Sequence, residues 1–176
     1  MVPTNNSQPT IEIEHASQDD IEAVTDLWVR LARDQREYES YVRAADNRET
    51  MRATLSAHQV NGGLLVARLD REVIGFTSFT IERGSLELDG TRGLLSNLYV
   101  DPAARDRGVG SALLEAAEET LREQGADVMI LEVMAENEDA RRFYRRQGYD
   151  TYRVAMERSL EDEGASENDT HSKEDG

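Results

Sequence analysis

Apolar and polar residues follow one another along this chain in two rhythms, one typical of strands and one typical of helices. Residues 11–13 alternate isoleucine with glutamate, which predicts a short strand. Apolar residues then recur at helical spacing between Ile21 and Leu31, and a second helix is expected over residues 48–60. The first third of the chain is therefore expected to contribute one strand and two helices.

The rest of the chain alternates between the two patterns. Strands are expected at residues 64–69, 73–81, 94–100, 128–134 and 149–160, the last as a strand or a strand pair. Helices are expected at residues 108–124 and 137–147, each followed by a glycine that ends it. The order β-α-α-β-β-β-α-β-α-β predicts an α/β fold with a mixed sheet and at least one parallel crossover.

The two ends of the chain differ from its middle. Residues 1–9 are polar, contain two prolines and are expected to form a loose arm. Residues 161–176 contain almost nothing apolar and are expected to form a disordered acidic tail. A chain of 176 residues is long enough for one domain and short for two, so one domain is expected over residues 10–160.

The charge balance is unusual. Asp and Glu number 36 against 20 Lys and Arg, which gives a formal net charge of −16. Lysine occurs once, as Lys173, so nearly all the basic residues are arginines. An acidic, lysine-poor surface is similar to that of proteins from salt-accumulating halophiles, where salt screens self-repulsion; an ordinary acidic protein is the alternative. General nucleic-acid binding is disfavoured, because no net positive field attracts phosphate.

Several other classes are excluded or disfavoured by composition. The chain has no cysteine and three scattered histidines, which excludes thiolate chemistry and disfavours a metal site. No apolar run approaches the roughly 20 residues that span a bilayer, so no membrane association is expected. The first residues lack the features of a secretory signal, so a cytoplasmic location is expected. The oligomeric state stays open between a monomer and a homodimer.

The strongest local signal for chemistry is a glycine turn at the start of a predicted helix. The strand ending at Val100 leads to Gly108-x-Gly110, an arrangement whose free N–H groups suit a phosphate. A Walker loop would need a lysine before Ser111, and a dinucleotide-binding fingerprint would need glycine in place of Leu113. A plain strand–turn–helix with incidental glycines remains the simplest alternative.

Two motifs together resemble the GNAT (GCN5-related N-acetyltransferase) superfamily. The first is Arg105-x-x-Gly108-x-Gly110, which matches the pattern Arg/Gln-x-x-Gly-x-Gly/Ala of that superfamily. The second is residues 131–149, LEVMAENEDARRFYRRQGY, with the expected Asn-x-x-Ala-x-x-Phe-Tyr and Gly-aromatic steps. The resemblance is close over residues 92–150 and looser over 11–90. It implies a mostly antiparallel sheet, splayed at the cofactor site, with flanking helices.

The resemblance also implies where acetyl-CoA would lie. Backbone N–H groups from Arg107 to Ser111 would hold the pyrophosphate, and the backbone of residues 98–100 would pair with the pantetheine arm as an added strand would. Asn137 would hydrogen-bond the cofactor, cap its helix, or do both, and Arg141 could reach a CoA phosphate. The residues implied to bind acetyl-CoA are Leu98, Tyr99, Val100, Arg105, Arg107, Gly108, Val109, Gly110, Ser111, Asn137 and Arg141.

The resemblance implies direct transfer of acetyl to a primary amine in a ternary complex, which needs a general base and a general acid. Tyr144 is the implied acid for the leaving thiolate; its other interpretation is a core aromatic beside Phe143. Glu132 is the implied base. It lies twelve residues before Tyr144 in a Leu-Glu-Val strand, where the ribosomal-protein N-terminal acetyltransferases have a glutamate as proposed base. Its other interpretation is a solvated residue at the sheet edge.

One position departs from many members of the superfamily. The residue before Asn97 is often acidic there, and here it is Ser96. Glu87 or Asp89 from the preceding segment could supply the missing carboxylate. The amine acceptor is left open between a peptide N-terminus, a lysine side chain, a polyamine and a small amine. A non-catalytic acyl-CoA-binding module on the same fold is the alternative function.

Overall fold

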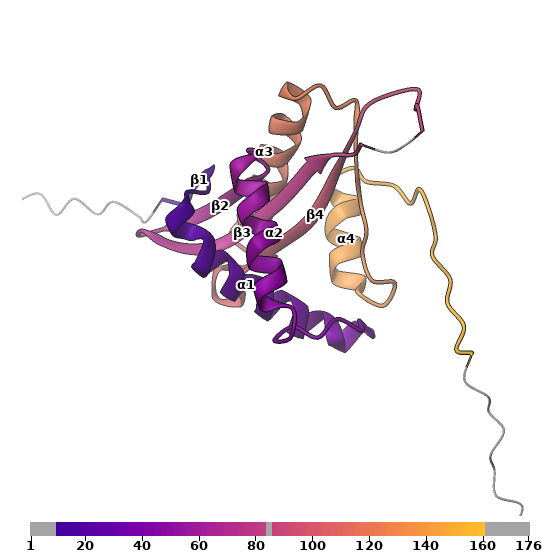
Figure 1. Ribbon diagram of the computed structural model, residues 1–176, viewed down its shortest axis with the longest axis horizontal. Coiled ribbons are helices and arrows are strands. Elements are labelled where there is room, and N and C mark those ends of the chain that lie inside the picture. Colours follow the sequence, from indigo (N-terminus) through magenta and orange to yellow (C-terminus); the bar gives the residue numbers. More distant parts are fainter. Residues whose placement is uncertain (1–9, 84–85, 161–176) are drawn as a thin grey trace, which may run out of the picture.

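Within the residues that the structure describes, the sheet has five strands in the order β1-β2-β3-β4-β5. The computed structural model describes residues 10–83 and 86–160. The strands are β1 Glu12–His15, β2 Leu64–Leu69, β3 Glu72–Ile81, β4 Arg92–Val100 and β5 Val128–Leu131. The first four pair antiparallel, and β5 runs parallel to β4 (Figure 1). The predicted mixed sheet with a parallel crossover is therefore confirmed.

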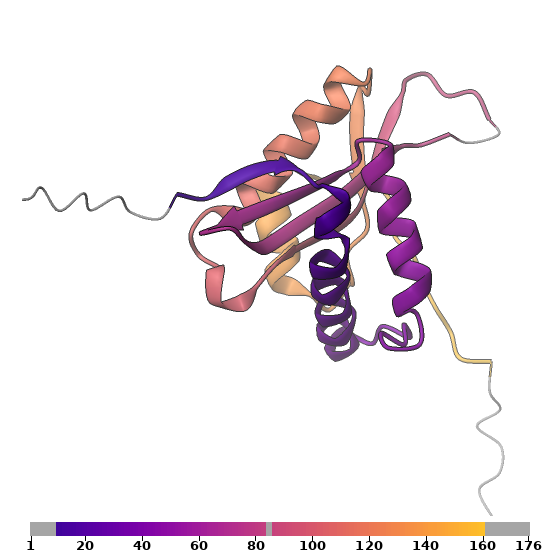
Figure 2. The same ribbon diagram turned by 60° about the vertical axis from the view of Figure 1, so that its left-hand side comes forward.

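Helices cover both faces of the sheet (Figure 2). They are α1 Ile21–Asp34, α2 Arg48–Val60, α3 Val109–Glu123 and α4 Glu138–Arg146. Alternation along β2 divides the core, because successive side chains of a strand point to opposite faces. Val66 lies in the core under α1 and α2, whereas Leu65 and Ala67 lie in the core under α3, against which Phe143 of α4 also packs.

The pairing between β4 and β5 covers only the first half of β4. Their pairing ends at Leu95 and Leu131, while β4 continues to Val100. A bulge contributes to this: Ser78 pairs with Asn97 and Phe79 pairs with Leu95, so Ser96 has no partner on β3. Bulges bend and twist the strand that carries them. The second half of β4 thus presents an edge that no described strand covers. The strand predicted over residues 128–134 is shorter in the structure and ends at Leu131.

The strand expected over residues 149–160 is a wrong prediction. Residues 151–160 belong to no strand and are exposed throughout, running away from the sheet beyond α4 (Figure 1). Tyr152, Val154 and Met156 do alternate as a strand requires. Alternation alone does not supply a pairing partner, and no described strand lies beside this segment.

The arm 1–9 and the acidic tail 161–176 both lie outside the described residues. Within the described ranges, no helix is long and apolar enough to cross a membrane.

Candidate active site

The loop between β4 and α3 leaves a run of backbone donors unused. The first bond of α3 runs from the Ala112 N–H to the Gly108 carbonyl, at 3.0 Å. None of the N–H groups of residues 106–111 donates a hydrogen bond to any described residue. Gly108 turns the chain into the helix with φ 77°, a conformation that costs glycine little. These free N–H groups and the positive end of the helix dipole form a site for an anion.

Gly110, in the first turn of α3, lies close to both β4 and α4. A Cβ at Gly110 would stand 3.6 Å from Phe143 Cζ on α4 and 3.9 Å from Val100 Cγ2 on β4. Glycine therefore keeps open the space between the end of β4 and α4. This is also where β4 has lost its partner β5, so the anion site and the free strand edge adjoin.

Arg105 supports the loop from outside. Its Nε donates to the Val100 carbonyl at 3.0 Å, its guanidinium lies 5.4 Å from the Tyr99 ring centroid, and it is 3.9 Å from the Asp34 carboxylate on α1. The side chain of Arg105 thus links the end of β4 to α1. Arg107 is exposed and forms no ion pair with any described residue, so it is the cation of the loop that remains available.

Helix α4 is seated on the start of α3 by polar contacts. The Gln147 side chain donates to Ser111 Oγ at 3.0 Å, and the Tyr149 hydroxyl donates to the Glu118 carboxylate at 2.7 Å. Sequence reasoning did not single out Gln147. Nothing in the local pattern indicates it, because its partner lies 36 residues earlier.

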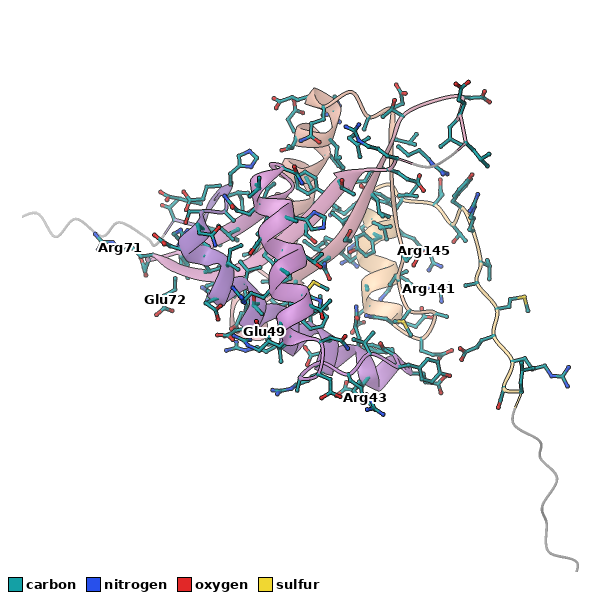
Figure 3. The ribbon with its side chains drawn as sticks, viewed as in Figure 1. Arg43, Glu49, Arg71, Glu72, Arg141 and Arg145 are labelled. Atoms are coloured by element: carbon teal, nitrogen blue, oxygen red, sulfur yellow. The ribbon has the colours of Figure 1, made fainter. Side chains whose placement is uncertain are left out.

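The first turn of α4 is fixed by two of the predicted cofactor residues. The Asn137 side chain accepts from the Ala140 N–H at 3.0 Å, so it caps the helix and its amide NH₂ remains available. Arg141 donates to the Ala135 carbonyl at 3.0 Å and pairs with Glu138 at 2.9 Å, which braces the connection from β5. Arg141 and Arg145 stand one turn apart on the same side of α4 (Figure 3).

Tyr144 lies in an aromatic cluster on α4. Its ring centroid is 5.2 Å from that of Phe143 and 5.8 Å from that of Tyr149, both edge-on. It packs against the same core as Leu98 and Val100 from the free part of β4. Its hydroxyl makes no hydrogen bond to the described residues. Burial raises the pKa of Tyr144 to about 12, so the phenol is protonated at neutral pH.

The three acidic residues considered as base are placed very differently. Glu132 follows directly after β5, at the point where the two strands separate, and is exposed. Glu87 and Asp89 precede Arg92, the first residue of β4, and so lie at the far end of that strand from the splay. At about 3.3 Å per residue, several residues of β4 separate them from the free edge. The fold therefore favours Glu132 over both alternatives.

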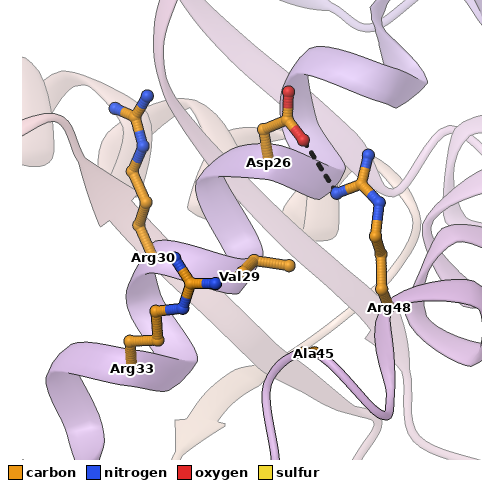
Figure 4. A pocket seen from close by; sticks show the side chains of 6 residues that line it. All are labelled: Asp26, Val29, Arg30, Arg33, Ala45 and Arg48. Atoms are coloured by element: carbon orange, nitrogen blue, oxygen red, sulfur yellow. Dashed lines mark ion pairs between the residues drawn. The ribbon is translucent and has the colours of Figure 1, made fainter.

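A separate pocket of about 330 Å³ lies between α1 and the start of α2 (Figure 4). It is lined by three arginines with Asp26, Val29 and Ala45; the arginines are Arg30, Arg33 and Arg48. Arg48 pairs with Asp26 at 2.7 Å, and Arg30 pairs with Asp101 after β4 at 2.9 Å. Arg33 has no ion-pair partner among the described residues.

Comparison with known proteins agrees with this geometry. Residues 21–149 match the sequence profile of the Acetyltransferase (GNAT) family. The chain belongs to this family. It is 31% identical over 141 residues to an aminoalkylphosphonate N-acetyltransferase of Salmonella typhimurium, covering 80% of this chain and 86% of that one.

Solved GNAT structures share the fold. A GCN5-related N-acetyltransferase from Ralstonia eutropha superposes with a TM-score of 0.68 at 23% identity, over 85% of this chain and 99% of that one. The PaiA N-acetyltransferase from Thermoplasma acidophilum, solved in complex with coenzyme A, also has a TM-score of 0.68, at 20% identity over 83% of this chain and 93% of that one. The GNAT fold inferred from the motifs is confirmed.

Proposed function

We propose that this GNAT protein is an acetyl-CoA-dependent N-acetyltransferase acting on a primary amine. The observation that carries the proposal is the run of unused N–H groups over residues 106–111, which opens onto the free edge of β4. A pyrophosphate needs several donors on one side, and this loop offers them without a competing protein acceptor. The coenzyme A complex of the Thermoplasma relative supports the same ligand class.

The free half of β4 is the proposed seat of the pantetheine arm. Residues 98–100 continue past the last pair with β5, so their outward backbone groups can pair with an amide-containing chain. Gly110 leaves room for this arm between Val100 and Phe143. The thioester would then lie where β4 and β5 diverge, beside Glu132.

Tyr144 is the proposed acid. During transfer the amine nitrogen forms a bond to the acetyl carbon, the C–S bond breaks, the amine loses a proton and the sulfur gains one. Because burial raises the pKa of Tyr144 to about 12, the phenol is protonated at neutral pH and has a proton to donate. It is a weaker acid than a thiol, so its main contribution is a hydrogen bond that strengthens as negative charge develops on sulfur.

Glu132 is the proposed base, acting on the incoming amine directly or through water. It is solvent-exposed at the splay, which suits a group that passes a proton to solvent after each turnover. A non-catalytic acyl-CoA-binding module is the competing function. It would need the anion site but no protonated phenol beside the free strand, so amine-dependent release of CoA thiol distinguishes the two.

For the acceptor, we propose a small amine that also carries an anionic group. In the pocket between α1 and α2, Arg30 and Arg48 already have carboxylate partners, whereas Arg33 has none among the residues that the structure describes. The Salmonella relative is named for an aminoalkylphosphonate, an amine of this class. Acetylation rates of aminoalkylphosphonates and of alkylamines of equal length that lack the phosphonate test this proposal. Equal rates with both kinds of amine would contradict it.

We also propose that the protein works at high salt in the cytoplasm of a salt-accumulating cell. The support is the net charge of −16 with a single lysine. At about 1 M salt the Debye length is near 3 Å, so the repulsion between surface carboxylates is largely removed.

A further inference from the structure

The loop that carries the candidate anion site is tied to α1 by two bridges of opposite polarity. Arg30 on α1 donates to the Asp101 carboxylate at 2.9 Å, and Asp34, one helical turn later, lies 3.9 Å from the Arg105 guanidinium. Asp101 and Arg105 stand at the two ends of the short turn Pro102–Ala104. Helix α1 therefore holds the loop on both sides of this turn.

Asp101 is the loop end of the first bridge, and it is fixed by two further hydrogen bonds. Its backbone N–H donates to the Ile74 carbonyl on β3 at 2.7 Å, and its Oδ1 accepts from the Ala103 N–H at 3.0 Å. One carboxylate oxygen thus starts the turn while the other receives Arg30. An asparagine at this position would keep the bond to Ala103 and lose only the charge opposite Arg30.

Asp34, on the helix side of the second bridge, also holds β4. It accepts a hydrogen bond at 3.2 Å from the hydroxyl of Tyr99, which is 5% exposed. Burial and the Asp34 carboxylate raise the pKa of Tyr99, so its hydroxyl remains a donor. Tyr99 precedes Val100, whose carbonyl accepts from Arg105 Nε. Asp34 therefore meets both the end of the free edge of β4 and the start of the loop.

The charge of these two carboxylates does not favour an anionic ligand. Carboxylates beside the loop repel phosphate, in a chain whose net charge is already −16. A phosphate site made of backbone N–H groups depends instead on the shape of the loop, because all the donors must point to one place. Side chains that hold this shape before the ligand arrives raise affinity by preorganisation.

We propose that Asp34 and Asp101 are positioning residues for acetyl-CoA, which hold the loop against α1 so that the N–H groups of residues 106–111 stay aimed at the pyrophosphate. The inference rests on the proposed function, since it takes acetyl-CoA as the ligand of this loop. Both bridges lie at the end of β4 and not at the splay where transfer is proposed. They therefore act on cofactor affinity and not on the transfer step.

The affinity for CoA, measured by calorimetry at multimolar salt, tests both carboxylates. We expect the dissociation constant to rise about threefold in Asp34→Asn and in Asp101→Asn, and about tenfold in the double variant, the scale of partly exposed ion pairs. A carboxylate that only repels phosphate would give tighter binding when it is removed. Equal or tighter CoA binding in either single variant would therefore overturn the proposal.

The control is Glu37→Gln. Glu37 is an exposed carboxylate in the turn that follows α1, and it forms no ion pair with any described residue. Its removal changes the net charge as the other two substitutions do and breaks no bridge to the loop. This variant should bind CoA at least as tightly as wild type. Weaker binding by Glu37→Gln, equal to that of Asp34→Asn, would reduce the effect to net charge and overturn the positioning role.

A merely structural role is distinguished by kinetics and by a mutant cycle. The KM for acetyl-CoA should rise with the dissociation constant while kcat stays unchanged, and the unliganded variants should melt near the wild-type temperature. Arg30→Met should weaken CoA binding as Asp101→Asn does, and combining them should add nothing, because both remove the same bridge. A fall in kcat without a rise in KM, or additive effects of this pair, would overturn the proposal.

The same titrations separate this inference from the proposed function. A wild-type protein that does not bind CoA at all would overturn both. A wild-type protein that binds CoA, with Asp34→Asn and Asp101→Asn binding it equally well, would overturn only the positioning role and leave the acetyltransferase proposal intact.

Discussion

Gly110 on α3 faces Phe143 on α4 across a gap in which a Cβ would stand 3.6 Å from the Phe143 ring. That spacing is ordinary van der Waals contact, so alanine fits the free protein. Valine adds two methyl groups that fill the gap beside Val100. We predict that Gly110→Val abolishes the thermal stabilisation by CoA while leaving the unliganded protein folded.

The matched variant is Gly110→Ala, which should melt at or above the wild-type temperature without ligand, since alanine is the better helix former by about 1 kcal/mol. Its stabilisation by CoA should be reduced and not lost. Melting curves with and without CoA at high salt measure both variants. A Gly110→Val protein stabilised by CoA as strongly as wild type would place the cofactor elsewhere.

Tyr144→Phe removes one oxygen and keeps the ring, so the contacts with Phe143 and Tyr149 should survive. We predict a fall in turnover of about 10²-fold or more, the usual scale of acid–base contributions, with CoA affinity little changed. Because the pKa of Tyr144 is about 12, its phenol stays protonated between pH 7 and about 10. Its titration should therefore not lower wild-type activity in that range. Near-full turnover of Tyr144→Phe under single-turnover conditions would eliminate it as the acid.

Glu132→Gln removes the proposed base at the splay. A base must be deprotonated, so wild-type activity should fall on the acid side of the pH–rate profile, and this limb should disappear in the variant. Glu136→Gln, an exposed carboxylate in the same connection to α4, is the control and should keep the wild-type profile. If Glu132→Gln retains both the rate and the acid limb, solvent or another group takes the proton.

The parts of the fold that sequence could predict are those fixed by short-range pattern. The strand to Val100, the glycine turn and α3 form one local unit whose residues all obey the same motif, and the structure has each element there. Asn137 as helix cap is equally local, since its acceptor contact is with Ala140.

What sequence could not predict depends on partners far along the chain. The bulge at Ser96 has no signature of its own, because it exists only relative to the register of β3. The motif predicts Arg105 at the cofactor loop but does not indicate that its side chain contacts Val100 and Asp34, because Asp34 lies far earlier in the chain. Residues 151–160 have the alternation of a strand, but a strand also needs a neighbouring strand to pair with. No described strand lies beside this segment.

Low salt should unfold the protein. The net charge of −16 is screened at multimolar salt and far less at about 0.1 M, where the Debye length is near 10 Å. We predict loss of far-ultraviolet circular dichroism and of cooperative melting after dialysis into dilute buffer, with partial recovery on return of salt. Full cooperative melting in dilute buffer would remove the halophilic proposal and leave the enzymatic one intact.

The central claim is tested most directly by thiol release from acetyl-CoA with a panel of primary amines at high salt. The account predicts release that requires both protein and amine, saturates with acetyl-CoA, and is strongly reduced in Tyr144→Phe. Binding of acetyl-CoA with no amine-dependent release across peptides, polyamines, small amines and aminoalkylphosphonates would contradict it and favour a non-catalytic acyl-CoA-binding module.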